Sequence, residues 1–168
     1  GVDRATPVLA LGGGVVGDVA GFAASSLLRG LPFVQLPTTL LAAVDSSVGG
    51  KTGVNHGGGK NTLGAFHQPR LVYCALDAFQ TLPDAEVASG LAEVVKAAAI
   101  RDATLLGSLE DQSGPLTACA PEVVGPVVAR CVALKAGVVS QDVRDRGVRA
   151  LLNAGHTVGH GLEAALDF

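Results

Sequence analysis

A run of three glycines directly after a short apolar segment constrains the fold of this chain more than any other feature. Residues 7–11 read PVLAL, and residues 12–18 continue as GGGVVGD. A short apolar run closed by glycines is typical of a buried strand. Residues 17–28, GDVAGFAASSLL, then suit a helix that is rich in small side chains. The sequence therefore predicts a strand–turn–helix unit at the start of the chain.

Residues 8–28 are also apolar enough to raise a membrane-spanning helix as the alternative. Three features argue against that alternative. Asp18 stands in the middle of the segment, glycines crowd one half of it, and no basic cluster flanks it as a topology signal. We therefore expect the buried strand–turn–helix unit, and no association with a membrane.

Two further apolar segments extend the same pattern. Residues 31–37, LPFVQLP, predict a second buried strand bounded by prolines, and residues 70–76, RLVYCAL, predict a third. Between them, Thr38 or Thr39 can cap a helix over residues 40–47. This alternation of strands and helices favours a mostly parallel sheet with helices on its faces.

The pattern changes after Pro83. Residues 84–100 carry apolar side chains at helical spacing, with acidic side chains in the first turn that complement the helix dipole. Residues 111–126 predict a loop-rich connection, and residues 127–141 and 155–166 predict further helices. Because no strand-like alternation follows, we predict an α/β part and then an all-α part, with a boundary near residues 77–83.

The charge and cysteine content narrow the class of protein. The formal net charge is -3, so a broad nucleic-acid-binding surface is not expected. The three cysteines are scattered and form no C-x-x-C pair, which is typical of buried, reduced thiols in an intracellular protein.

Gly12, Gly14 and Gly17 follow a G-x-G-x-x-G pattern between the first predicted strand and its helix. Glycines there let the backbone approach a phosphate, and the helix N-terminus supplies free N–H groups. A standard dinucleotide fold also has an acidic ribose ligand at the end of the next strand, where this chain has Gln35. The same glycines can serve simple helix–strand packing, so the motif alone leaves dinucleotide binding open.

Two lysines lie within residues 48–64, a stretch with seven glycines that we expect to form a loop. SVGGKTG, which contains Lys51, is close to a P-loop, but Asp45 stands where the first glycine is required. GGGKN, which contains Lys60, has Asn61 in place of the required serine or threonine. Neither segment is a P-loop, yet each places a lysine in a glycine frame where it can reach an anion such as phosphate.

Lys96 and Lys135 are the remaining lysines, and a solvated surface charge explains Lys135 tolerably. Lys96 lies in an otherwise apolar helix, three residues after Glu93. A buried carboxylate must be paired or bind a metal, because its isolated charge is costly. The alternative is a surface ion pair between Glu93 and Lys96, worth about 0.2–0.5 kcal/mol.

His156 and His160 stand four residues apart, which suits two metal ligands on one helix face. The residue after His156 is not glutamate, so the pair is not an H-E-x-x-H motif. With Glu93 as an oxygen ligand, the site would still have room for a substrate oxygen. Arg149 and Asn153 precede His156, and the arginine fork is a natural partner for a substrate carboxylate.

Taken together, these segments make the chain similar to the 3-dehydroquinate synthases, the shikimate-pathway enzymes that close a sugar acid into a carbocycle. The likeness is carried by GGGVVGDVAGFAASSLLRG, PTTLLAAVDSSVGGKTGVNH, GKNTLGAFHQP, LAEVVKA and LLNAGHTVGHGLE. The resemblance implies a Rossmann-like NAD-binding α/β domain over residues 1–80 and a helical metal- and substrate-binding domain over residues 81–168. The active site would lie between them.

Carried over by motif, the resemblance implies sites for two cofactors. Glu93 and His156 would ligate zinc or cobalt together with a histidine beyond Phe168. His160 would face the substrate instead, which differs from the metal-binding pair that the spacing suggests. The residues implied to contact NAD are Gly14, Val15, Val16, Gly17, Asp18, Thr38, Thr39, Lys51, Lys60, Phe79, Gln80 and Thr81.

The resemblance also implies the substrate site and the assembly. Arg29 matches a basic residue that reaches the active site of the partner subunit in the family's cytoplasmic homodimer. We expect weak or no turnover from this 168-residue segment by itself. The positions that match substrate-contacting residues are Asp45, Lys51, Asn61, Lys96, Lys135, Arg149, Asn153 and His160.

The implied reaction converts 3-deoxy-D-arabino-heptulosonate 7-phosphate to 3-dehydroquinate and phosphate, with NAD as a catalyst. One rival is a cyclase for a neutral sugar phosphate, of the 2-epi-5-epi-valiolone or 2-deoxy-scyllo-inosose type. Such relatives alter the positions of Lys135, Arg149 and Asn153, because their substrates have no carboxylate. A metal-dependent polyol dehydrogenase would leave Lys51 and Lys60 without a phosphate to bind. The full set of matching charged residues argues against a non-catalytic scaffold.

Overall fold

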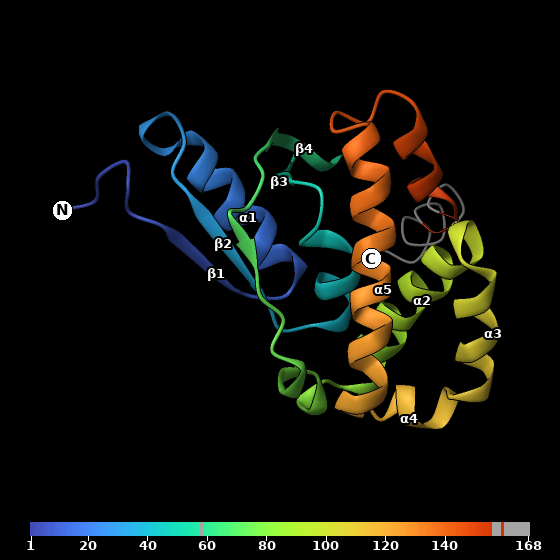
Figure 1. The fold of residues 1–168 in the computed structure, drawn as a ribbon. Helices are drawn as coiled ribbons and strands as arrows, with labels where there is room; N and C mark the ends of the chain where they lie inside the picture. The colour runs from blue at the N-terminus through green and yellow to red at the C-terminus, as the bar shows by residue number, and fades with distance from the viewer. Residues whose placement is uncertain (58, 156–158, 160–168) are drawn as a thin grey trace.

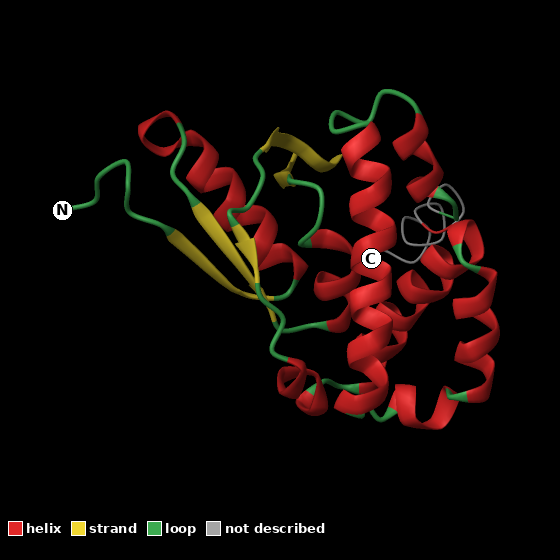
Figure 2. Ribbon diagram, viewed as in Figure 1, coloured by secondary structure: helices red, strands yellow, loops and turns green. Residues whose placement is uncertain are grey.

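The computed structural model describes residues 1–57, 59–155 and 159. Its first part contains a three-stranded parallel sheet with the order β1-β2-β5 (Figures 1 and 2). The strands are β1 (Val8–Gly12), β2 (Phe33–Pro37) and β5 (Leu71–Val72). All three predicted strands are confirmed, although the third is much shorter than residues 70–76. Gly12 pairs with Pro37, so β1 and β2 end at the same edge of the sheet.

Helix α1 (Gly14–Ser26) connects β1 to β2 and packs against both strands. Its small side chains allow this close contact, since a Cβ atom on Gly21 would stand 3.1 Å from the ring of Phe33. The helix begins at Gly14 rather than at residue 17, because Gly13 already has the extended backbone of an N-cap. A short 3₁₀ turn, η1 (Leu27–Arg29), follows α1.

Residues 48–64 do not form the predicted loop. They contain most of an antiparallel hairpin, made of β3 (Lys51–His56) and β4 (Gly59–Phe66), which packs against α1. Gly53 and Gly64 are paired across it, and a Cβ atom on Gly64 would stand 2.2 Å from a backbone carbonyl of β3. The prediction was wrong because the pairing depends on close cross-strand approach, which glycine permits but which strand propensity does not reveal.

The second part is helical. The helix predicted over residues 84–100 is confirmed, whereas the loop-rich connection predicted over residues 111–126 is wrong. That segment holds α4 and the start of α5, where a proline occupies the first helical turn and costs no backbone hydrogen bond. The helices are α2 (Asp84–Arg101), α3 (Ala103–Asp111), α4 (Ser113–Thr117) and α5 (Pro121–Gln141). Most of the helix predicted over residues 155–166 lies outside the described residues.

Three short helical turns join these elements. The helix predicted over residues 40–47 is present as the π-helical turn η2 (Ala42–Ser46), which contacts α1, α2 and α5. The 3₁₀ turn η3 (Leu76–Thr81) leads from the sheet to α2, and η4 (Val148–Asn153) follows α5. Beyond residue 83 the described part of the chain contains no strand. The predicted order, α/β first and helical second, is therefore confirmed.

The main hydrophobic core lies in the helical part. Val94 of α2, Val124 of α5 and Leu40 before η2 are fully buried in it. Length and composition alone would let α5 cross a membrane. In this structure α5 packs against η2, α2 and η4. Figure 1 shows it standing among the other helices. Its buried residues include Val124 and Cys131, which belong to the hydrophobic core.

Gly90 and Gly107 provide a matched test of this packing. A Cβ atom on Gly90 in α2 would stand 2.6 Å from Leu40 Cβ and 2.8 Å from Leu41 N, whereas nothing lies within 4 Å of one on Gly107 in α3. Gly90→Ala should lower the free energy of unfolding by about 2 kcal/mol. Gly107→Ala should raise it by up to about 1 kcal/mol. Urea denaturation of both variants checks this, and equal effects would contradict the packing of α2 on η2.

Candidate active site

The ends of β1 and β2 bring two predicted cofactor segments together. Thr38 N donates a 2.9 Å hydrogen bond to Gly12 O, and a Cβ atom on Gly13 would stand 3.1 Å from Thr39 Cγ2. The turn before α1 and the residues after β2 therefore share the carboxyl edge of the sheet. Ligands of open α/β sheets bind at this edge.

The N-terminus of α1 faces outward at the same edge. Its N-cap residue, Gly13, has no side chain that could accept a hydrogen bond from the first N–H groups of the helix. Val15 in the first turn is 78% exposed. The first N–H groups of a helix have no acceptor within the helix, so they suit an anion such as a pyrophosphate. Gly17 has another role, because a Cβ atom there would stand 2.6 Å from Gln35 Oε1. For Gly17, helix–strand packing is the reason that glycine is needed.

An open cleft of about 1250 Å³ lies where the hairpin, α2, α5 and η4 meet. Eight residues match substrate-contacting positions of the family that the sequence resembles, and seven of them line this cleft. They are Asp45, Lys51, Asn61, Lys96, Lys135, Arg149 and Asn153. Asp18, Lys60 and the predicted metal ligand Glu93 line it as well.

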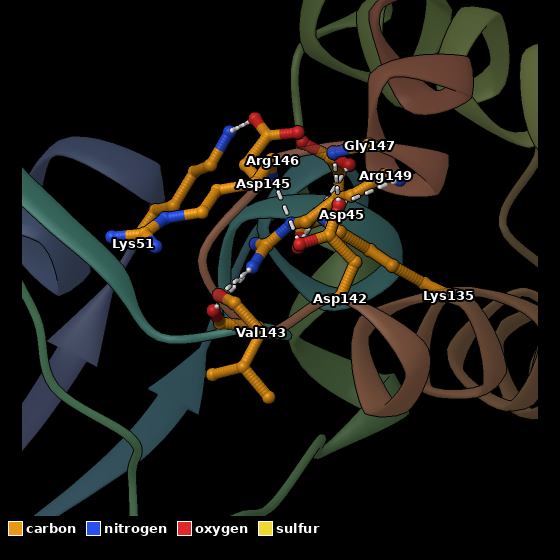
Figure 3. Close-up of polar contacts among 10 residues, drawn as sticks. Asp45, Lys51, Lys135, Asp142, Val143, Asp145, Arg146, Gly147 and Arg149 are labelled. Carbon is orange, nitrogen blue, oxygen red and sulfur yellow. Dashed lines mark hydrogen bonds and ion pairs between the residues drawn. The ribbon is translucent and has the colours of Figure 1, made fainter.

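Lys135 and Asp45 form the central ion pair of the cleft. Lys135 Nζ donates to Asp45 Oδ1 and to Asp45 O, both at 2.6 Å (Figure 3). The Lys135 side chain is 11% exposed, so the sequence-based alternative of a solvated surface charge is wrong. Burial lowers the pKa of Lys135, and the charge of Asp45 opposes that shift.

Asp18 of α1 faces the same pair. Burial and the negative charge of Asp45 together raise its pKa to about 6, against the opposing effect of the Lys135 charge. The protonation of Asp18, which lies on the helix that begins at the carboxyl edge of the sheet, therefore depends on the charges of Asp45 and Lys135 in the cleft.

Glu93 forms an ion pair with Lys96 on α2, and both side chains are largely buried, at 21% and 14% exposure. Glu93 Oε2 is buried and receives no hydrogen bond of good geometry from the described residues. A buried carboxylate oxygen held only by one flexible lysine fits a divalent cation that would displace the lysine. Within residues 1–57, 59–155 and 159, no three His, Cys, Asp or Glu side chains come together as a complete metal site. Predicted His156 and His160 lie outside the described residues.

Arg149 is only 2% exposed at the back of the cleft. Its Nη1 donates to Gly49 O at 3.0 Å and to Val143 O at 2.9 Å. Burial lowers the pKa of the guanidinium, and the charge of Asp145 opposes the shift. Lys51 forms an ion pair with Asp145, which is remote in sequence (Figure 3). The loop that follows α5 therefore holds two positively charged side chains of the cleft, those of Lys51 and Arg149.

Sequence reasoning missed Asp142 and Asp145 in this loop. Their segment, DVRDRG, is charged throughout and has the composition of a solvated turn. Only the contacts with Lys51 and Arg149 reveal that it belongs to the site.

Some predicted residues do not line the cleft. Arg29 is exposed in η1, and Phe79 is 1% exposed within the helical core. Gln80 and Thr81 are exposed beside Phe79. Their proposed contacts with NAD or a partner subunit stay predictions.

The sequence matches two family descriptions that together cover it. Residues 1–89 match the 3-dehydroquinate synthase N-terminal family, and residues 90–168 match the 3-dehydroquinate synthase C-terminal family. This chain belongs to the 3-dehydroquinate synthase family. A 3-dehydroquinate synthase from Symbiobacterium thermophilum (strain DSM 24528 / JCM 14929 / IAM 14863 / T) is 56% identical over 167 residues, which are 99% of this chain and 47% of the relative.

Solved structures of other sugar phosphate cyclases share the fold. A 2-deoxy-scyllo-inosose synthase complexed with carbaglucose-6-phosphate, NAD+ and Co2+ is 33% identical, with a TM-score of 0.91 over 98% of this chain and 45% of that chain. The 2-epi-5-epi-valiolone synthase from Streptomyces hygroscopicus subsp. jinggangensis 5008, with NAD+ and Zn2+ bound, is 35% identical. Its TM-score is 0.87 over 92% of this chain and 44% of that chain. The chain thus spans about half the length of each of these relatives.

Asp18 gives this 3-dehydroquinate synthase family member a testable pH dependence. Its folded-state pKa of about 6 lies above the ordinary 3.8, so the native state binds a proton more tightly than the unfolded state. Stability should therefore fall as the pH rises from about 4 to about 6. Asp18→Asn should raise the free energy of unfolding at pH 7.5 by about 1–2 kcal/mol and add much less at pH 4. Urea denaturation at both pH values checks this.

The exposed Asp77 of η3 supplies the control. Asp77→Asn should change the free energy of unfolding by about the same small amount at both pH values, within 0.5 kcal/mol. An Asp18→Asn variant that behaves like this control would contradict the raised pKa of Asp18, which burial and the charge of Asp45 produce.

Proposed function

We propose that the full-length protein is a 3-dehydroquinate synthase. It would convert 3-deoxy-D-arabino-heptulosonate 7-phosphate to 3-dehydroquinate and phosphate, with NAD and a divalent cation, zinc or cobalt, as cofactors. The observation that carries the proposal is the convergence of the matching cationic and amide side chains from both halves of the chain on one cleft. The 56% identity to the Symbiobacterium enzyme supports it.

The cleft can bind a substrate that is anionic at two points. Lys51, Lys60 and Asn61 come from the hairpin, and a compact ammonium in a glycine frame suits the phosphate. Arg149 approaches from η4, where its planar fork suits a carboxylate. This arrangement favours a sugar acid phosphate over the neutral sugar phosphates of the related cyclases.

Lys135 is suited to proton transfer. Two of its three N–H donors are directed at Asp45, which fixes Nζ in the cleft. The pKa of Lys135 is lowered by burial, so the ammonium gives up a proton more readily than an exposed lysine does. Lys135 can therefore hold a substrate oxygen, or move a proton at Nζ as phosphate leaves.

Glu93 and the N-terminus of α1 are the groups suited to the two cofactors. The buried Glu93 Oε2 would hold the cation, and Lys96 would then be released to the substrate. The first turn of α1, with Thr38 and Thr39, would hold the NAD pyrophosphate. When bound, NAD would take up and return a hydride, and the cation would polarise a substrate oxygen.

The proposal extends to the assembly and the compartment. We expect a cytoplasmic homodimer in which the exposed Arg29 reaches the active site of the other subunit. The three cysteines are free, which agrees with a reducing compartment.

Assay of the full-length protein tests the function. With NAD and zinc, it should release phosphate from the heptulosonate phosphate and form an equal amount of 3-dehydroquinate, without net NADH. A chelator should abolish turnover, and zinc or cobalt should restore it. Activity on glucose 6-phosphate or sedoheptulose 7-phosphate but not on the heptulosonate would assign one of the neutral-sugar cyclases. Net accumulation of NADH would assign a polyol dehydrogenase.

Helix α5 provides a matched pair of variants for the same assay. Lys135→Met should lower kcat/KM by about 100-fold or more, because it removes the cation at the reacting centre. Arg130 lies on the same helix but forms an ion pair with Asp102, outside the cleft. Arg130→Met should therefore leave kcat/KM within about twofold of the wild type. Equal losses in the two variants would contradict the placement of Lys135.

A further inference from the structure

The loop between α5 and η4 is organised by a single carboxylate. Asp142 Oδ1 accepts a hydrogen bond from Arg146 N at 2.9 Å. Asp142 Oδ2 accepts hydrogen bonds from Gly147 N at 2.7 Å and from Arg149 N at 3.2 Å. Figure 3 draws Asp142 together with Arg146, Gly147 and Arg149. Through these hydrogen bonds the Asp142 side chain binds the backbone of the loop that follows it.

Helix capping does not explain this carboxylate. Asp142 is the C-cap residue of α5, and its own backbone N–H already closes the helix onto Val138 O and Val139 O. A negative side chain at a helix C-terminus interacts unfavourably with the helix dipole. An aspartate is therefore a poor choice for the stability of α5 itself, and its role lies in the loop.

The loop in turn fixes the side chain of Arg149. Nη1 of that side chain donates to Val143 O within the loop and to Gly49 O in the turn before β3. Gly49 has a φ of +104°, and a Cβ atom on it would stand 2.4 Å from Arg149 Nη2. The guanidinium thus lies between the loop and the turn before β3 and is hydrogen-bonded to both. Its position depends on where the backbone of Arg149 is held.

The same loop also holds Lys51. Asp145 has a φ of +53°, a conformation that costs energy for a residue with a side chain, and in it Asp145 forms the ion pair with Lys51. Arg146 N and Gly147 N, the next two amides, both donate to Asp142. The carboxylate of Asp142 therefore stabilises the turn that presents Asp145.

We infer that Asp142 is a positioning residue for Arg149, holding its guanidinium at the substrate-carboxylate end of the cleft. The inference rests on the proposed function for the role of Arg149, but the placement of Arg149 by Asp142 is independent of the reaction. Asp142 does not line the cleft, so it would touch neither substrate nor cofactor. It acts through the backbone N–H groups of Arg146, Gly147 and Arg149.

Chemical labelling tests the placement without any assay. Phenylglyoxal reacts with accessible guanidinium groups, and peptide mass spectrometry follows the modification of Arg149 in the full-length protein. Asp142→Ala should increase the labelling rate of Arg149 at least about fivefold, because the 2% exposed side chain is released. Asp142→Asn, which keeps the shape and one acceptor oxygen, should give a smaller increase and serves if the alanine variant does not fold.

Asp102 is the matched control. It also accepts a backbone N–H, from Leu105 at 2.9 Å, and pairs with Arg130, but it does not line the cleft. Asp102→Ala should lower stability and leave the labelling of Arg149 unchanged. Unchanged labelling in both Asp142 variants would overturn the inference, whatever reaction the protein catalyses.

A double-mutant cycle on the holoenzyme tests the functional half. Asp142→Ala should raise KM for the heptulosonate phosphate about tenfold, with kcat changed by less than about threefold. In an Arg149→Met background the same substitution should change KM by less than about twofold, because its effect acts through Arg149. Equal effects in both backgrounds would overturn the inference. Wild-type protein that labels as expected but does not turn over this substrate would refute the proposed function instead.

Discussion

The ion pair between Lys135 and Asp45 is the interaction on which the rest of the site depends. Asp45 lies in η2, the helical turn that follows β2 in the chain, and Lys135 lies in α5. The Lys135 side chain is only 11% exposed, and removal of Asp45 would leave this buried ammonium without its ion pair. The pair thereby fixes α5 against η2. Its two charges also act on the pKa of Asp18, which Asp45 raises and Lys135 lowers.

The local elements of this fold are well encoded in the sequence. The run of glycines after residues 7–11 predicts the first strand and α1, and the spacing of apolar residues after Pro83 predicts α2. The charged residues that match the family predict the charged side chains that line the cleft. The strand and the two helices depend on periodicity and residue type, which are visible within a short window, whereas the residues of the cleft are implied only by the resemblance to the 3-dehydroquinate synthases.

The features that sequence reasoning missed depend on contacts between distant segments. The hairpin of β3 and β4 forms because Gly53 and Gly64 meet across the strands, and composition alone favours a loop there. Asp142 and Asp145 look like solvated charges until Lys51 and Arg149 are placed beside them. The buried state of Glu93 likewise decides against a simple surface ion pair with Lys96, a choice that the sequence leaves open.

We propose that Glu93 binds a divalent cation beside an NAD molecule held at the end of the sheet. Anomalous diffraction from crystals of the full-length protein with NAD and zinc tests it most directly. We expect a zinc peak about 2.0–2.2 Å from a carboxylate oxygen of Glu93, with Lys96 moved away from that oxygen. A zinc peak elsewhere, with the Glu93–Lys96 ion pair intact, would contradict it.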